Sequence, residues 1–561
     1  MQTEHRNSES VVSRRSFLRK SALGAGSAAV AGSLLEPWLA PAGAWGTASA
    51  ARLAATTIDA TKFASAAELR NLVAKLVSLG LRSPGSTAHN HAIAFLENQL
   101  RAIPGLKIHS DYYTIDRWQP LAHAPGGRLG RDLARSGDLR IDHSGSVQTA
   151  PVIGAVPFSL PTSTTGHRGQ LVYIAPGQAI TPGNARGKIV LIDVAPAPVA
   201  YAELGLIAYY RSPGSPTTGN YDRPYARDLN TPLFDAGVAQ AAGLVFLWDA
   251  PTDQLEGYWD PHAGTRYRVP AVFVGSDHAS RLKQLAATGA SANVIVRAKW
   301  DRARTRNLLA TLPGQTRERI ILNSHTDGLD WVQENGSAGV IALARYLACV
   351  PRSQRHRDIE FALTSSHLGY RYDGTDRLAA QLNNDYPEGT VAFVISMEHM
   401  GTREILPSGP SNRLHFTGKP ELTAWSAPEE SPVLVNASVA AVKRRNLHNV
   451  SVLKGVEAPV ADRVPQFCSQ GGIGTNFNSQ LIPTISTITG PWSLWAPSFG
   501  EHAVDFNRMR AEVLALGDVV RGLDRVPRAQ IAGAYIQERR KRAQGSPTCD
   551  VTPPPRGAPK H

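Results

Sequence analysis

Short apolar runs that alternate with helical patterns constrain the fold of this chain more than any other feature of its sequence. The runs stand at residues 320–322, 359–363, 391–395 and 482–488. After the first run, Val340, Leu343, Ala344 and Leu347 recur at the spacing of one helix face. Strands that alternate with helices form a largely parallel sheet covered on both faces. We therefore predict an α/β fold with a mostly parallel sheet flanked by helices.

The residue pattern of the sequence changes along the chain, which indicates several domains. Residues 51–115 carry two helical patterns, and residues 116–300 consist of short β-rich runs broken by Pro and Gly. The alternation of strands and helices occupies residues 301–527. We predict that residues 116–300 form a β-rich domain inserted into the α/β domain. The basic, Pro-rich tail at residues 528–561, with four basic residues in a row at 539–542, is predicted to be disordered.

The overall composition fits a globular protein and argues against a nucleic-acid partner. Charged residues make up 19% of the 561 residues and apolar residues 42%, with a net charge of +13. Basic and acidic residues are mixed through most of the chain. The basic stripes with interleaved aromatic residues that typify nucleic-acid-binding proteins are missing. We interpret the excess charge as a solvated basic surface and predict no nucleic-acid partner.

The first 50 residues have the pattern of a twin-arginine export signal. Arg14 and Arg15 precede a mildly apolar stretch of small residues at 22–39, and residues 48–50 offer a small-x-small cleavage site. A membrane anchor is the alternative, but Gly, Ser and Pro break the run, which is too weakly apolar to hold about 20 residues in lipid. We predict a secreted or periplasmic protein that starts near Ala51 and has no stable membrane span after cleavage.

Three cysteines, Cys349, Cys468 and Cys549, are too few for a disulfide scaffold in a chain of this length. Cys549 lies in the tail that we predict to be disordered. Cys349 with Cys468 is therefore the pair to test for a disulfide.

Polar side chains that can bind metals follow three of the apolar runs. His325 and Asp327 follow the first run, His367 follows the second and Glu398 follows the third. Glu334 stands directly before the helical pattern that comes after the first run. In open α/β sheets, ligands bind beyond the carboxyl ends of the strands, so these side chains should converge. Histidine nitrogen and carboxylate oxygen suit zinc, and a catalytic zinc site needs about three protein ligands and one open position.

His325, Glu334 and Glu398 would supply such a set of three ligands. Asp327, two residues after His325, is placed to accept the other ring N–H of that histidine and to fix its tautomer. Asn335 is predicted to cap the helix that follows.

The order, spacing and flanks of these residues resemble the zinc-dependent aminopeptidase family, which includes bacterial leucyl aminopeptidases, glutamate carboxypeptidase and the transferrin receptor. The sequence has the family's Leu-Pro-Gly turn at 312–314, His-x-Asp at 325–327, and an acidic residue before Asn-x-Ser at 334–337. The resemblance covers most of residues 60–525. The β-rich insert resembles the protease-associated domain that many members carry at this place.

This resemblance implies a hydrolase that acts on the N-terminal amide of a peptide or on a related small amide. His325 matches the histidine that binds the first metal, and Asp327 matches its orienting partner. Glu334 falls where the family's bridging aspartate stands, and Glu398 falls where the third carboxylate stands.

The sequence departs from the family at the second metal. The family has two adjacent glutamates, one the general base and one a metal ligand, and they fall on Ser366 and His367. The last histidine ligand should lie near residues 472–475, where no histidine occurs. His367 could act as a base or as a ligand, but a serine cannot take the proton of an attacking water. We predict one zinc ion, held by the three ligands above, with His367 close by as a ligand or catalytic base.

Two alternatives differ in function class. A serine hydrolase is one, because Ser337 opens a helix, but Asn335 replaces the first glycine of the nucleophile elbow. A catalytically inactive relative that acts as a binding protein is the other, because a fold does not determine a function. We favour the enzyme, since four of the expected positions keep side chains that can bind metal.

Overall fold

The computed structural model describes residues 57–121, 129–194, 198–222, 229–260, 266–333, 335–369, 371, 373–384, 390–455 and 470–544. The predicted export signal at residues 1–50, the predicted ligand Glu334, and Cys468 and Cys549 lie outside the described residues. Cys349 is exposed, and its pairing with Cys468 stays a prediction. No helix in the described ranges is long and apolar enough to cross a membrane.

A nine-stranded sheet confirms the predicted α/β fold. Its order is β1-β13-β15-β14-β16-β21-β19-β20-β8. The parallel centre consists of β15 (Asp358–Thr364), β14 (Arg319–His325), β16 (Val391–Met397) and β21 (Thr484–Thr489). These strands contain the four apolar runs predicted from the sequence, except that β21 begins two residues later. Every residue of β16 is buried, as expected for a strand with helices on both faces.

Further strands, most of them paired antiparallel, complete both edges of this sheet. At one edge, β1 (Lys107–Pro120) pairs along its whole length with β13 (Ala298–Leu312), which pairs in turn with β15. At the other edge, β19 (Thr423–Ala427) is followed by β20 (Val450–Lys454) and then by β8 (Ala208–Arg211). Strand β8 therefore joins the main sheet although it comes from the span of the predicted insert.

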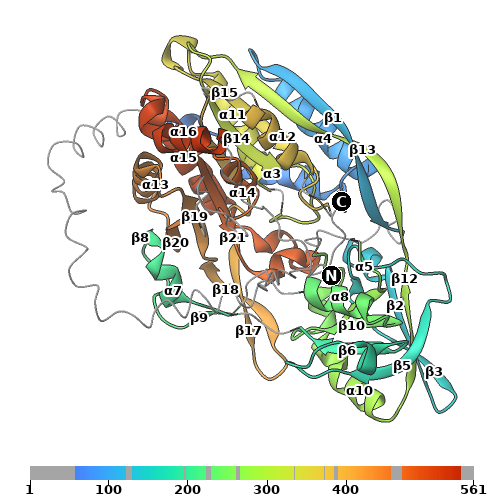
Figure 1. Cartoon of the computed structure of the whole chain (residues 1–561). Helices are drawn as coiled ribbons and strands as arrows, with labels where there is room; N and C mark the ends of the chain where they lie inside the picture. The colour runs from blue at the N-terminus through green and yellow to red at the C-terminus, as the bar shows by residue number, and fades with distance from the viewer. Residues whose placement is uncertain are drawn as a thin grey trace, which may run out of the picture.

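The remainder of that span forms a second, eight-stranded sheet, seen in the lower right of Figure 1. Its order is β3-β2-β12-β5-β6-β10-β11-β4. Its strands are β2 (Gly137–His143), β3 (Ser146–Ala150), β4 (Gly154–Ala155), β5 (His167–Tyr173), β6 (Ile189–Asp193), β10 (Gly243–Leu247), β11 (Ala271–Val274) and β12 (Ser291–Val296). The predicted boundaries of the insert fall within β1 and β13, which run as a long ribbon from the main sheet toward this second sheet (Figure 1). The likeness to a protease-associated domain stays a prediction.

Helices cover both faces of the main sheet because successive residues of its strands point to opposite sides. Leu322 joins the large core under α11 (Asn335–Ala348), whereas Ile321 joins a smaller core with α12 (Asp373–Asn384) and α14 (Gly474–Ser479). On the first side, α11 packs against α3 (Ala66–Val77), α4 (Thr87–Arg101) and α15 (Phe506–Leu523). The loops after the central strands are thereby held between two packed layers.

Helix α16 (Arg528–Ala543) contradicts the disorder predicted for this stretch. It buries Ile531 and Tyr535, one turn apart, and packs on β16. Even Arg539, from the basic run, is buried and donates to the carbonyl of Gln480 at 2.6 Å. Disorder was predicted because the tail carries consecutive charges. A helix distributes consecutive residues around its axis, however, so a row of apolar residues can still face the sheet. Residues 545–561 lie outside the described part.

Helix α13 (Pro432–Arg444) packs on α15 and on the strands β19 and β20 of the main sheet. The remaining elements are η2 (Ala60–Lys62), α5 (Leu129–Ala134), α6 (Pro182–Ala185), β7 (Val199–Ala200), α7 (Tyr201–Leu206), β9 (Asn220–Tyr221), α8 (Asn230–Val238), α9 (Thr252–Leu255), α10 (Ser276–Ala287), η3 (Arg352–Gln354), β17 (Arg403–Ser408), β18 (Arg413–Pro420), η4 (Trp492–Trp495) and η5 (Pro497–Ala503).

Candidate metal centre

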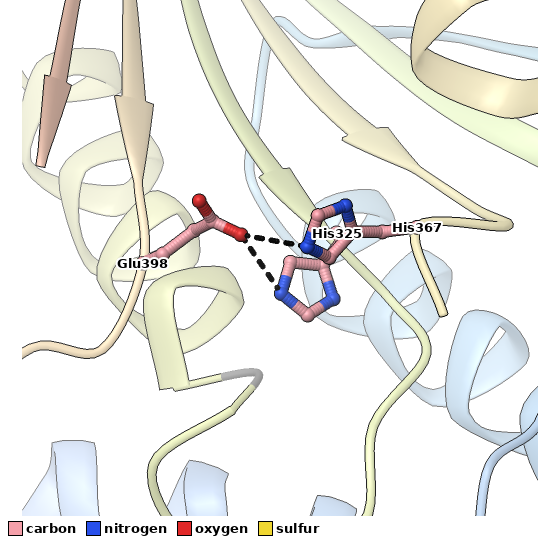
Figure 2. A group of neighbouring side chains, drawn as sticks. All are labelled: His325, His367 and Glu398. Atoms are coloured by element: carbon pink, nitrogen blue, oxygen red, sulfur yellow. Dashed lines mark ion pairs between the residues drawn. The ribbon is translucent and has the colours of Figure 1, made fainter. Parts of the chain in front are cut away.

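Three of the predicted side chains meet beyond the carboxyl ends of the central strands. His325 ends β14, Glu398 directly follows β16, and His367 lies three residues after β15. Figure 2 shows both rings directed at one oxygen of the carboxylate: the Nε2 atom of each histidine lies 3.3 Å from Oε1 of Glu398. Across the described ranges, this is the one group of three His, Cys, Asp or Glu residues whose ligand atoms all lie within 4.8 Å of one another.

The distances and donor types fit a zinc ion. Two ligand atoms at about 2.0–2.1 Å from a tetrahedral zinc are themselves about 3.3 Å apart. His325 and Glu398 are fully buried, and His367 is 7% exposed. Nε2 of His325 and Oε1 of Glu398 make no hydrogen bond with any described residue, although buried polar atoms nearly always have a partner. A cation between these atoms would satisfy them.

The electrostatics of the cluster favour a bound cation. Burial would raise the pKa of Glu398, but the charges of His367 and His325 outweigh it and hold that pKa well below its usual range. Burial would lower the pKa of His325, but Glu398 and then Asp327 raise it above its ordinary value. The carboxylate is therefore ionised, and a proton competes with the metal for the same histidine nitrogen.

The ring of His325 is oriented by a main-chain carbonyl. Its Nδ1 atom lies 2.7 Å from the carbonyl oxygen of Asp327, whereas the Asp327 carboxylate lies 3.9 Å away. An Nδ1–H that donates to this carbonyl leaves Nε2 for the metal. The predicted orienting partner is thus the correct residue, but its backbone performs the role assigned to its side chain.

The Asp327 carboxylate instead holds the loop that carries His367. It accepts the main-chain N–H of His367 at 3.3 Å and that of Leu368. Between β15 and His367, Ser366 adopts φ of +66°, in the left-handed region. Such a conformation costs a non-glycine residue about 1–3 kcal/mol and persists when its surroundings hold it. Asp327 is one of the groups that hold this loop.

A glycine turn occupies the place where the resemblance puts the last histidine ligand. The N–H of Ile473 donates to Oε2 of Glu398 at 2.9 Å. The preceding Gly472 has φ of +54°, and a Cβ atom there would lie 1.7 Å from the same oxygen. One oxygen of Glu398 is thus bound by the backbone, and the other faces the two histidines.

The loop after β16 is fixed by two side chains that sequence reasoning did not place there. Asn335 begins α11 and binds Met400 twice: Oδ1 accepts its N–H at 2.8 Å, and Nδ2 donates to its carbonyl at 2.7 Å. The prediction that Asn335 caps the helix was therefore wrong, because the Met400 backbone offers it two bonds at once. Glu512 of α15 accepts the N–H of Gly401 at 2.7 Å. Its signal in the sequence is an acidic residue among the apolar residues of a helix.

Ser337 and His89 have structural roles. Ser337 is buried, and its hydroxyl donates to the carbonyl of His325 rather than to a histidine ring, which contradicts the serine hydrolase alternative. His89 is buried and accepts the N–H of Gly85 at its Nδ1 atom, while its Nε2 atom lies 2.8 Å from the Thr326 hydroxyl. Burial lowers the pKa of His89 to about 3, so its ring is neutral.

Solved structures of aminopeptidases and peptidases have a similar architecture. The aminopeptidase from Aneurinibacillus sp. strain AM-1 matches with a TM-score of 0.51 and 16% identity, over 82% of this chain and 94% of that one. A zinc aminopeptidase from Bacillus subtilis matches with a TM-score of 0.56 and 14% identity, over 83% and 98%. A peptidase M28 precursor from Shewanella amazonensis matches with a TM-score of 0.56 and 14% identity, over 85% and 96%.

Neither a family model nor a curated protein matches the sequence itself. At 14–16% identity, similar structures show a shared fold and leave the activity open. The chain therefore has the fold of the zinc aminopeptidases, as the resemblance of its motifs predicted.

Proposed function

We propose that this protein is an exported, metal-dependent hydrolase of the peptidase type, with one zinc ion held by His325, His367 and Glu398. The convergence of these three side chains, at the distances of a tetrahedral site and on this fold, carries the proposal. When bound, zinc polarises an amide carbonyl and activates water for attack on it. Export is supported by the twin-arginine pattern of the N-terminus.

In this proposal His367 is a metal ligand rather than the base. Its Nε2 atom lies at the same Glu398 oxygen as that of His325, and the two ring centroids are 4.6 Å apart. A nitrogen bound to a metal cannot also take a proton from water. Glu334 stays a predicted ligand.

Hydrolysis by such a centre should be slow. The described cluster contains no second carboxylate near Glu398 Oε1, and the Asp327 carboxylate is bound by two main-chain N–H groups. A positioned general base contributes about 10²–10⁴-fold to such reactions, and Ser366 stands where the family has one. The proposed substrate is the N-terminal amide of a peptide or a related small amide. The similar structure from Aneurinibacillus sp. strain AM-1 is named an aminopeptidase, which fits this substrate class.

The missing general base also favours a second candidate, a catalytically inactive protein that keeps the fold and binds peptides or amides. The two candidates separate on turnover in the presence of zinc. A protein that binds zinc and hydrolyses no aminoacyl amide or short peptide would be the binding protein.

Metal analysis of the purified mature protein tests the proposal. We expect one zinc per chain, its loss in His325→Ala, and no hydrolysis of aminoacyl amides by His367→Ala. His109→Ala, at an exposed position of β1, is the matched control and should retain zinc. Two zinc ions per chain, or none at a pH where the histidines are neutral, would contradict the proposed centre.

A further inference from the structure

The paired strands β1 and β13 hold the loop that carries His367 on the side opposite Asp327. The hydroxyl of Tyr113, on β1, lies 2.6 Å from Oγ of Ser365, and the hydroxyl of Thr305, on β13, lies 3.0 Å from the same atom. Asn307, also on β13, accepts the main-chain N–H of Ser365 at 3.1 Å. The Tyr113 hydroxyl also lies 3.4 Å from Oγ of the strained Ser366.

The start of α12 shows how tightly this network is packed. Asn307 donates through Nδ2 to the carbonyl of Gly374 at 2.7 Å. A Cβ atom at Gly374 would lie 2.0 Å from the carbonyl oxygen of Ser365 and 2.5 Å from the hydroxyl oxygen of Tyr113. Any side chain at this position would push the helix and the network apart. The glycine thus allows three elements, β1, β13 and α12, to close on the residues just before His367.

We infer that Tyr113, Thr305 and Asn307 are positioning residues that set His367 as a metal ligand by fixing Ser365. This inference rests on the proposed zinc centre. Ligand atoms must lie within about 0.2 Å of their bonding distances, so a loop that is strained at Ser366 needs support from both sides. None of the three residues is in the cluster of metal-binding side chains. Strand β1, at the outer edge of the sheet, therefore helps to position the metal ligand His367 through the loop that follows β15.

Two neighbouring tyrosines provide a matched test. Tyr113→Phe removes the hydroxyl at Ser365, whereas Tyr112→Phe removes a hydroxyl on the opposite face of the same strand, where the side chain is 51% exposed. Groups that support metal ligands contribute about 10–100-fold to metal affinity, so we expect zinc affinity to fall about tenfold in Tyr113→Phe and to stay unchanged in Tyr112→Phe. The affinity is measured by competition with a chelator.

Two further measurements separate positioning from general stability. Ser365→Ala removes the shared oxygen, so it should lower zinc affinity as Tyr113→Phe does, and the double variant should lower it no further. The absorption spectrum of the cobalt-substituted protein should change in Tyr113→Phe, because a shifted His367 alters the geometry around the metal. A loss of thermal stability without a change in affinity or spectrum would show a merely structural role and overturn the inference.

The outcomes distinguish this inference from the proposed function. A wild-type protein that binds no zinc contradicts the proposed centre. A wild type that binds zinc, together with Tyr113→Phe and Tyr112→Phe variants of equal affinity, overturns the positioning role alone. If Tyr113→Phe does not fold, Thr305→Val, which removes the second hydroxyl at Ser365 at nearly constant volume, must show the same loss of affinity.

Discussion

Gly472→Ala should abolish tight zinc binding by displacing Glu398. A Cβ atom at Gly472 would stand 1.7 Å from Oε2 of Glu398 and 2.9 Å from its Cδ, and real Cβ contacts are essentially never shorter than 3.0 Å. Either the carboxylate or the glycine turn must therefore move by more than about 1 Å, several times the tolerance of about 0.2 Å for a zinc ligand. The displaced carboxylate would no longer face both histidines.

The expected loss of affinity is at least a hundredfold, which corresponds to about 3 kcal/mol at 1.4 kcal/mol per tenfold. A separate effect acts on folding, because φ of +54° at Gly472 costs an alanine about 1–2 kcal/mol. The two effects need different measurements. Zinc affinity is determined by chelator competition, and stability is determined by denaturant unfolding of the zinc-free protein.

Gly471→Ala is the control for this experiment. Gly471 has φ of +79°, so an alanine there meets a similar backbone cost, but its Cβ would lie 3.2 Å from Ile488 and 3.4 Å from Ser426, away from Glu398. Both variants should lose stability, and Gly472→Ala alone should lose zinc. Equal zinc affinities in the two variants would refute the assignment of Glu398 as a ligand.

Three further perturbations test other parts of the protein. Burial raises the pKa of Asp330 from 3.8 to about 7, so the folded protein holds this proton more tightly than the unfolded chain. Stability should therefore fall by up to about 4 kcal/mol as pH rises from about 4 to about 7, and Asp330→Asn should flatten this decline in urea unfolding. Asp327→Ala should lower zinc affinity about 10–100-fold by freeing the loop of His367; unaltered affinity would exclude that support. Lysine in place of both Arg14 and Arg15 should keep the precursor in the cytoplasm, and unchanged export on cell fractionation would disprove the twin-arginine signal.

The sequence predicted the strands of the central sheet well because their signal is local. Residues 391–395 are apolar without interruption, as a strand buried on both faces requires, and they lie within β16. The positions of His325, His367 and Glu398 after successive parallel strands were enough to predict that they converge. The error at α16 arose from the same local reading, since consecutive charges at 539–542 concealed the row formed by Ile531 and Tyr535.

Tertiary structure decided which atoms hold the metal-binding side chains. The path of the loop determines whether the carbonyl or the carboxylate of Asp327 contacts His325. Both groups belong to the same residue, so the sequence does not distinguish between them. Gly472 reaches Glu398, and Tyr113 reaches Ser365, across separations of 74 and 252 residues, where no periodic pattern links them. Residue type and spacing determine which groups arrive at the end of a strand, because period and polarity act between near neighbours. The contacts that set their final positions arise when distant segments pack, and a single sequence carries no separate signal for them.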